Sequence, residues 1–200
     1  MFYSAVISII GFLILLLNGR TKVDQKERIP KESNVILIAP HRSWLDPVFL
    51  ALASYPMRFT FMAKKEIFKN PLVRWLAEKM NAFPVDRENP GPSAIKTPVK
   101  TLKEGNLSLM MFPSGTRHAT DLKGGAITIA KLSGKPIVPA VYSGPYTLKD
   151  VLRRRKAIVR YGEPIIVERS TRLDHDTIKR LSTEIQESFD LIEKEIQNDH

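Results

Sequence analysis

The amino-acid sequence predicts an α/β fold in which helices flank a mixed, largely parallel β-sheet. Short apolar runs of strand length, such as 35–39 and 137–142, alternate with segments whose apolar residues recur every three or four positions. This alternation is typical of parallel sheets, in which a helix follows each strand and packs back onto the sheet. With 200 residues, 43% of them apolar, the chain is long enough to bury one sizeable core.

Local signals in the first half define each element in turn. We expect strands over 35–39, 58–63 and 81–85, and helices over 48–54, 71–80 and 92–104. The run 35–39 is apolar throughout, as a buried strand requires. Asp46 and Pro47 form a helix-start signal, with Asp46 as the cap, and Pro71 begins the next helix. Residues 22–33 are polar and basic, and we interpret them as a linker.

The second half continues the same alternation. We expect strands over 107–112, 137–142, 157–161 and 164–167, and helices over 124–132 and 174–196. The last two strands are predicted to pair with each other through a turn at Gly162. In the tail, Leu181, Ile185 and Phe189 recur at the spacing of one helix face, which indicates a helix that packs on the sheet.

The first nineteen residues form a segment without a charged side chain, and Arg20 and Lys22 follow it directly. Its length is borderline for crossing a bilayer. We expect residues 1–19 to anchor the chain in a cell membrane, either spanning it or partly embedded, and residues 20–200 to form the catalytic domain. The basic flank predicts that this domain lies on the cytoplasmic side. A buried core helix is the alternative for residues 1–19.

Charge and residue usage narrow the possible partners. The formal net charge is +10, which indicates an anionic partner such as a membrane surface, a phosphorylated substrate or nucleic acid. The basic run 153–156 fits anionic membrane lipid better than nucleic acid, because no nucleic-acid motif accompanies it. Cysteine is absent, which excludes disulfides and thiolate catalysis, and the four histidines lack the paired spacing of a metal site.

A histidine and an aspartate, His41 and Asp46, stand just after the first apolar strand. The end of a strand in an α/β sheet is where such proteins usually do chemistry. Histidine can take and return a proton near neutral pH, and a nearby carboxylate can orient its ring and stabilise its charged form. The pair therefore predicts general-base catalysis.

Basic residues follow three later strands in the same way. Lys64, Arg87 and Arg117 each come after an apolar run, so the sheet edge should bring them near His41. Such a cluster suits phosphate groups, which arginine can grip through two oxygens. Ser114 offers an alternative, a serine hydrolase with His41 as its base, although the surrounding sequence lacks the Gly-x-Ser-x-Gly elbow of α/β hydrolases.

Five segments, in this order, resemble the motifs of the glycerolipid acyltransferase family. They are Pro-His-Arg-Ser-Trp-Leu-Asp at 40–46, Ala-Lys-Lys-Glu at 63–66, Val-Asp-Arg at 85–87, Phe-Pro-Ser-Gly-Thr-Arg at 112–117 and Ile-Val-Pro-Ala at 137–140. Their order and spacing agree with those of bacterial 1-acyl-glycerol-3-phosphate acyltransferases. Ser114 departs from the family, which usually has Glu at this position.

The resemblance implies transfer of an acyl group from a thioester to the sn-2 hydroxyl of lysophosphatidic acid, which yields phosphatidic acid in phospholipid biosynthesis. It implies that His41 is the general base and that Asp46 orients it. It further assigns substrate binding to Lys64, Arg87, Ser114, Gly115, Thr116 and Arg117. Arg117 would hold the acceptor phosphate, and the loss of a carboxylate at Ser114 should favour an anionic acceptor.

The expected partners are lysophosphatidic acid, anionic membrane lipid and an acyl donor carried by coenzyme A or acyl carrier protein, without nucleic acid, a metal or a cofactor. Within the same class, glycerol-3-phosphate or another lysolipid is the alternative acceptor. From a different class, the alternative is a non-catalytic basic protein that binds membrane surfaces or nucleic acid.

Overall fold

The computed structural model describes residues 2–86, 91–112 and 119–199, with the side chains of 119–122 left aside. The helices are α1 (Phe2–Leu17), α2 (Asp46–Ala53), α3 (Pro71–Lys79), α4 (Ser93–Glu104), α5 (Ala119–Ser133), α6 (Leu148–Leu152) and α7 (His175–Asn198). The strands are β1 (Lys22–Asp24), β2 (Ile36–Ile38), β3 (Phe59–Lys64), β4 (Ala82–Val85), β5 (Ser108–Met111), β6 (Ile137–Ser143) and β7 (Ile158–Tyr161). Two short 3₁₀ helices, η1 (Lys26–Arg28) and η2 (Lys65–Lys69), join them.

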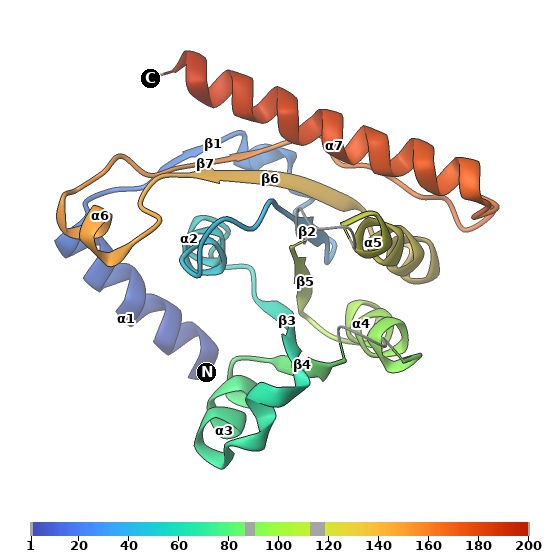
Figure 1. Ribbon diagram of the computed structural model, residues 1–200, viewed down its shortest axis with the longest axis horizontal. Helices are drawn as coiled ribbons and strands as arrows, with labels where there is room; N and C mark the ends of the chain where they lie inside the picture. The colour runs from blue at the N-terminus through green and yellow to red at the C-terminus, as the bar shows by residue number, and fades with distance from the viewer. Residues whose placement is uncertain (1, 87–90, 113–118, 200) are drawn as a thin grey trace.

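The strands form one seven-stranded sheet in the order β1-β7-β6-β2-β5-β3-β4, with β2 at its centre (Figure 1). The β6–β7 pair is antiparallel, and the other described pairs run parallel. The prediction of a mixed, largely parallel sheet flanked by helices is therefore confirmed. Because parallel neighbours end at the same edge, the residues that follow β2, β3, β5 and β6 gather along one side of the sheet.

Each face of the sheet carries its own apolar core. Along β2, Leu37 packs with the α2 residues Phe49 and Leu50, whereas Ile36 and Ile38 point to the opposite core. Helices α4, α5 and α7 cover that second face, and α1 and α2 cover the first (Figure 1). All three β2 residues are fully buried, so the strand is a firm support for the loop that follows it.

The sequence predicted different roles for α7 and α1: packing on the sheet for α7, and membrane anchoring for α1. The tail helix α7 buries Leu181, Ile185 and Phe189 against the sheet, as its spacing predicted. Helix α1 buries Tyr3 and Ile7 and leaves most of its other large apolar side chains exposed. Among the described residues, no helix is both long enough and apolar enough to cross a membrane. The anchor over 1–19 therefore stays a prediction.

The structure corrects the expected linker over 22–33. Its first residues form strand β1, which pairs in parallel with β7 and places Lys22 opposite Ile158. The strand has little apolar character, and ion pairs hold it instead. The Arg160 guanidinium on β7 lies 2.8 Å from the Asp24 carboxylate. This ion pair stabilises β1 at the edge of the sheet, although the polar composition of the segment is typical of a loop.

The expected pairing of 157–161 with 164–167 is also wrong. Strand β7 pairs with β6 and β1, and Ile165 makes an isolated antiparallel bridge with Ile137 on β6. Gly162 is a site of close packing rather than a hairpin turn. Its N–H donates to the Pro139 carbonyl at 2.8 Å, and a Cβ there would lie 2.8 Å from the Ser188 hydroxyl.

Candidate active site

The loop that carries His41 begins where the central strand ends. Ala39 extends the ladder by one more hydrogen bond, from its N–H to the Met111 carbonyl at 3.1 Å. Pro40 and His41 follow, and the chain then turns into α2. Because β2 is buried on both faces, His41 stands on a rigid support at the carboxyl edge of the sheet.

Asp46 closes this loop from within. The residue is only 1% exposed, and its Oδ2 atom accepts hydrogen bonds from the Arg42 N–H at 2.5 Å and the Ser43 N–H at 2.7 Å. The sequence predicted Asp46 as the N-cap of α2, and this is wrong: Asp46 is the first residue of the helix. Leu45 occupies the cap position and makes no side-chain hydrogen bond there. The carboxylate points back into the loop because it accepts hydrogen bonds there from the backbone N–H groups of Arg42 and Ser43.

The same Asp46 oxygen lies 3.1 Å from His41 Nδ1. Because a carboxylate only accepts hydrogen bonds, Nδ1 carries the ring proton in the neutral histidine, and Nε2 keeps the free lone pair. The His41 side chain is 42% exposed, while Asp46 is buried. The Phe112 ring, with its centroid 4.9 Å from that of His41, bounds the imidazole on one side. The arrangement is that of an accessible base with an oriented ring.

A second set of contacts, unforeseen from the sequence, fixes the loop from distant segments. The Ser43 hydroxyl donates to the Tyr146 carbonyl at 2.6 Å, and the Arg42 guanidinium pairs with Glu193 on α7. Partial burial would lower the pKa of Arg42, but the Tyr146 hydroxyl and the Glu193 carboxylate outweigh it and raise that pKa. Arg42 and Ser43 lie in the motif segment 40–46, whereas Glu193 resembles any polar residue on the exposed face of a surface helix.

Tyr142 stiffens the segment that holds Ser43. Its hydroxyl donates to the Pro145 carbonyl at 2.7 Å, and its ring stacks on Phe49 with a centroid distance of 4.7 Å. Burial raises the pKa of Tyr142 well above its ordinary value, so the hydroxyl remains a donor at all physiological pH values.

Lys64 lies at the same sheet edge as His41. Leu37 on β2 and Phe61 on β3 both face Met110 on the intervening strand, so counting onward places Lys64 level with Pro40. Two strand spacings separate them, about 10 Å at the level of the sheet. The Lys64 side chain is half exposed, and its Nζ is 3.9 Å from Glu66. A phosphate between Lys64 and His41 would meet this cation.

Five of the predicted substrate-binding residues lie outside the described ranges: Arg87, Ser114, Gly115, Thr116 and Arg117. Their roles stay predictions. The strands that precede them, β4 and β5, do end at the edge that carries His41. Within the described part of the chain, no cluster of three or more His, Asp or Glu side chains is placed to hold a metal ion.

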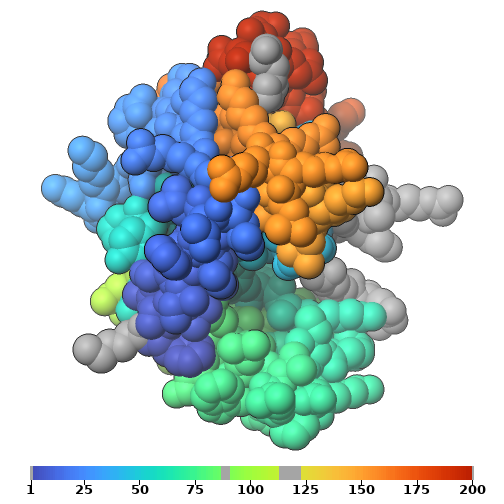
Figure 2. Space-filling view, turned by 90° about the vertical axis from the view of Figure 1, so that its left-hand side faces the viewer, coloured from blue at the N-terminus to red at the C-terminus, as the bar shows by residue number. Residues whose placement is uncertain are grey.

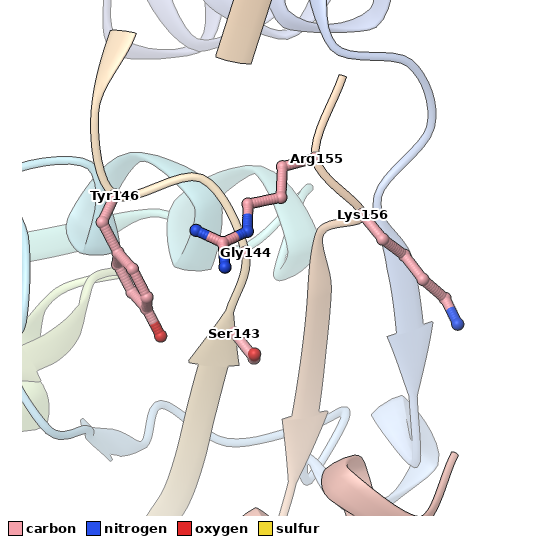
Figure 3. A pocket seen from close by; sticks show the side chains of 5 residues that line it. All are labelled: Ser143, Gly144, Tyr146, Arg155 and Lys156. Atoms are coloured by element: carbon pink, nitrogen blue, oxygen red, sulfur yellow. The ribbon is translucent and has the colours of Figure 1, made fainter. Parts of the chain in front are cut away.

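A pocket of about 460 Å³ lies at the carboxyl end of β6, lined by Ser143, Gly144, Tyr146, Arg155 and Lys156 (Figure 3). Tyr146 connects it to the His41 loop. The guanidinium of Arg155 extends across Gly144, and Lys156 points the other way. Arg155 lies 3.7 Å from the Asp150 carboxylate, and Lys156 donates a hydrogen bond to the Asp199 carbonyl.

The α/β sheet places the His41–Asp46 pair at its carboxyl edge, where an oriented histidine can accept a proton from a hydroxyl group. The sequence model of the family described as Acyltransferase matches residues 20–143, more than half of the chain. The chain belongs to this acyltransferase family.

Relatives of known name agree with this assignment. The 1-acyl-sn-glycerol-3-phosphate acyltransferase of Streptococcus pneumoniae is 41% identical over 201 residues, covering 100% of this chain and 76% of the relative. The enzyme of the same name from Bacillus subtilis is 45% identical over 155 residues, covering 76% of this chain and 77% of its own. The crystal structure of the 1-acyl-sn-glycerophosphate acyltransferase PlsC from Thermotoga maritima covers 94% of this chain and 79% of that one, with a TM-score of 0.66 at 24% identity, and shows the same fold.

Proposed function

We propose that this chain is a 1-acyl-sn-glycerol-3-phosphate acyltransferase in which His41 is the general base. The enzyme transfers an acyl group from a thioester to the free hydroxyl of lysophosphatidic acid. Two relatives that share this name, at 41% and 45% identity, support the reaction, and the 3.1 Å contact between His41 and Asp46 supports the role of the base.

The reaction needs one proton to move twice. His41 Nε2 takes the proton of the acceptor hydroxyl as its oxygen attacks the thioester carbonyl. The tetrahedral intermediate then collapses, the C–S bond breaks, and the imidazolium returns the proton to the leaving thiolate. Asp46 stabilises the positive charge on His41 between these steps. An acyl-enzyme is unnecessary, because the acceptor hydroxyl is itself the nucleophile.

The acceptor phosphate binds the basic residues at the same edge. Lys64 supplies one cation, and the family resemblance adds Arg87 and Arg117 from the segments that follow β4 and β5. Phosphate recognition by several cations holds the lipid by its headgroup and aims the sn-2 hydroxyl at His41. An enzyme for glycerol-3-phosphate could use the same cations, and the assay below separates the two acceptors.

Helix α1 is proposed as the membrane anchor of this enzyme, with the catalytic domain on the cytoplasmic side. Its outward side exposes Ile9, Phe12 and Leu16, each more than half accessible. A soluble surface rarely carries so large an apolar patch. The basic residues Arg20 and Lys22 follow it, as the positive-inside rule expects for cytoplasmic segments.

Acyl transfer by the purified protein tests the proposal. We would supply lysophosphatidic acid or glycerol-3-phosphate as the acceptor, and acyl-coenzyme A or acyl-acyl carrier protein as the donor. Wild-type protein should form phosphatidic acid, His41→Ala should lose at least about 10³-fold in kcat, and His175→Ala, an exposed histidine on α7, should match wild type. Equal activity of His41→Ala and wild type would refute the assignment of the base.

A donor-only assay separates the remaining alternatives. A serine hydrolase would release free fatty acid from the thioester without any acceptor, whereas the acyltransferase needs one. A non-catalytic basic protein would bind lipid vesicles or nucleic acid equally well with or without His41, and would form no product with any donor.

A further inference from the structure

Helix α3 is amphipathic in sequence but has no buried residue. Its apolar residues Leu72, Val73, Trp75 and Leu76 are all exposed, Leu72 by 73% and Trp75 by 50%. Helices with such a stripe normally bury it against a core, as α7 does. The described part of the chain leaves the stripe of α3 uncovered.

The stripe continues the apolar surface of α1. The rings of Phe2 and Trp75 meet edge-on with centroids 5.6 Å apart, which joins the two helices. In Figure 2, α1 (dark blue) runs down the face toward the viewer and reaches the green segment that contains α3 at its lower end. The exposed large apolar residues of α1 are Phe2, Ile9, Phe12, Leu13, Leu15, Leu16 and Leu17.

Positive charge surrounds this surface at the α3 end. Residues 64–79, which contain η2 and α3, carry five lysines and arginines against two glutamates. Lys69 and Lys79 lie beside and on the helix, and Arg74 lies on it with its guanidinium 2.7 Å from the Glu78 carboxylate. Apolar residues with tryptophan on one side and cations beside them are the features of helices that lie in the interface of an anionic bilayer.

We propose that α3 is a second lipid-contact element, which docks onto the surface of an anionic bilayer beside α1. The proposal rests on the proposed function, because an enzyme that acylates lysophosphatidic acid has to bind this lipid at the bilayer that contains it. Helix α3 connects β3, which ends at Lys64, to β4, which leads to Arg87. With α3 in the interface, Lys64 stands at the level of the lipid headgroups and meets the acceptor phosphate before the lipid leaves the bilayer.

Tryptophan fluorescence tests the contact directly. The chain has two tryptophans, so Trp44→Phe leaves Trp75 as the only emitter. Vesicles of phosphatidylcholine and phosphatidylglycerol with brominated acyl chains should shift its emission to the blue and quench it. Unquenched Trp75 emission from protein that cosediments with these vesicles would show that α1 alone touches lipid, and the proposal would fall.

Kinetics test the consequence with a pair of matched variants. Leu72→Glu places a charge on α3, and Leu191→Glu places the same charge at a site 59% exposed on α7. Loss of one inserted leucine should raise the KM for lysophosphatidic acid in vesicles by about tenfold or more in Leu72→Glu alone. Turnover of a water-soluble short-chain acceptor should not change in either variant.

The outcomes separate this proposal from the function beneath it. Equal KM values for the two variants on vesicles would overturn the lipid contact while leaving the acyltransferase intact. A wild-type protein inactive even on the short-chain acceptor would instead refute the proposed function. Light scattering on the purified protein tests whether a second copy of the chain binds the stripe instead of lipid. A wild-type dimer that Leu72→Glu converts to monomers would assign the stripe to a dimer interface and overturn the proposal.

Discussion

Asp46→Asn isolates the charge of the carboxylate from its geometry. Asp46 Oδ2 accepts hydrogen bonds from the Arg42 N–H, the Ser43 N–H and His41 Nδ1, whereas Oδ1, which is buried, has no partner among the described residues. An asparagine can therefore place its carbonyl oxygen where Oδ2 lies and its NH₂ group where Oδ1 lies. The backbone donors of Arg42 and Ser43 keep their acceptor, and so does Nδ1–H of His41.

The magnitude follows from the distance between the two groups. At 3.1 Å, a carboxylate and an imidazolium attract by about 5 kcal/mol at an effective dielectric constant of about 20, and by about 1 kcal/mol in bulk water. The His41 side chain is 42% exposed, so solvent screens part of this attraction. A value of about 3 kcal/mol predicts a loss of about 10²-fold in kcat, because in the proposed mechanism the imidazolium forms as His41 takes the proton of the acceptor hydroxyl.

The assay is acyl transfer to lysophosphatidic acid, with thermal unfolding followed by circular dichroism as the control for folding. We expect Asp46→Asn to unfold near the wild-type temperature, to lose about 10²-fold in kcat and to change KM little. Asp46→Ala should also lose stability, since it leaves the partly buried backbone N–H groups of Arg42 and Ser43 without their acceptor.

Two results would refute this reasoning. A loss below about threefold in Asp46→Asn would mean that the carboxylate charge does not act on His41 during the reaction. A loss of kcat in Asp46→Asn as large as that in His41→Ala, in a protein that unfolds at the wild-type temperature, would mean that Asp46 acts mainly by positioning the His41 ring. The electrostatic calculation would then be wrong.

Three further predictions concern the frame of the site and stability in acid. Gly144→Ala should lower the free energy of unfolding by about 1–3 kcal/mol in urea titrations, because its Cβ would lie 2.9 Å from a backbone atom of Ala157. Burial would raise the pKa of Asp24, but Arg160 and Lys22 together outweigh it and lower that pKa. The ion pair of Asp24 with Arg160 therefore stabilises the protein above about pH 4, and this stability is lost as the pH falls further. Arg160→Met should reduce the loss of stability with falling pH in urea titrations. Tyr161→Phe leaves the buried Ser54 hydroxyl without its 2.8 Å partner and should cost about 1–2 kcal/mol, measured the same way.

Local patterns predicted the elements that bury their own apolar residues. The strand around Leu37 and the tail helix with Phe189 lie where composition and spacing placed them, because each element's periodicity matches the face that it buries. The sequence did not predict the elements whose residues lack such an apolar periodicity. Strand β1 is held by Arg160, a residue 136 positions away from Asp24, and α6 begins with a capping box at Thr147 in a segment for which we predicted no helix.

The candidate site divides in the same way. His41 and Asp46 are five residues apart, and the turn into α2 brings them into contact, so their spacing after an apolar strand and the motif around them indicated a pair. The supports of the pair come from Tyr146 and Glu193, more than a hundred residues further along the chain. No local pattern marks such partners, since either residue would suit many surface positions.

The sequence by itself determined the class of fold and the type of most elements, and it indicated His41 and Asp46 after β2 as the candidate catalytic pair. Periodicity, turn residues and short-range hydrogen bonds depend only on neighbours a few positions away, and these are all present in the sequence. The tertiary structure alone decided that β1 joins the sheet edge, that Glu193 holds Arg42, and that α3 keeps its apolar stripe exposed beside α1. Those outcomes depend on which distant surfaces meet, and folding settles them through the packing of the whole chain.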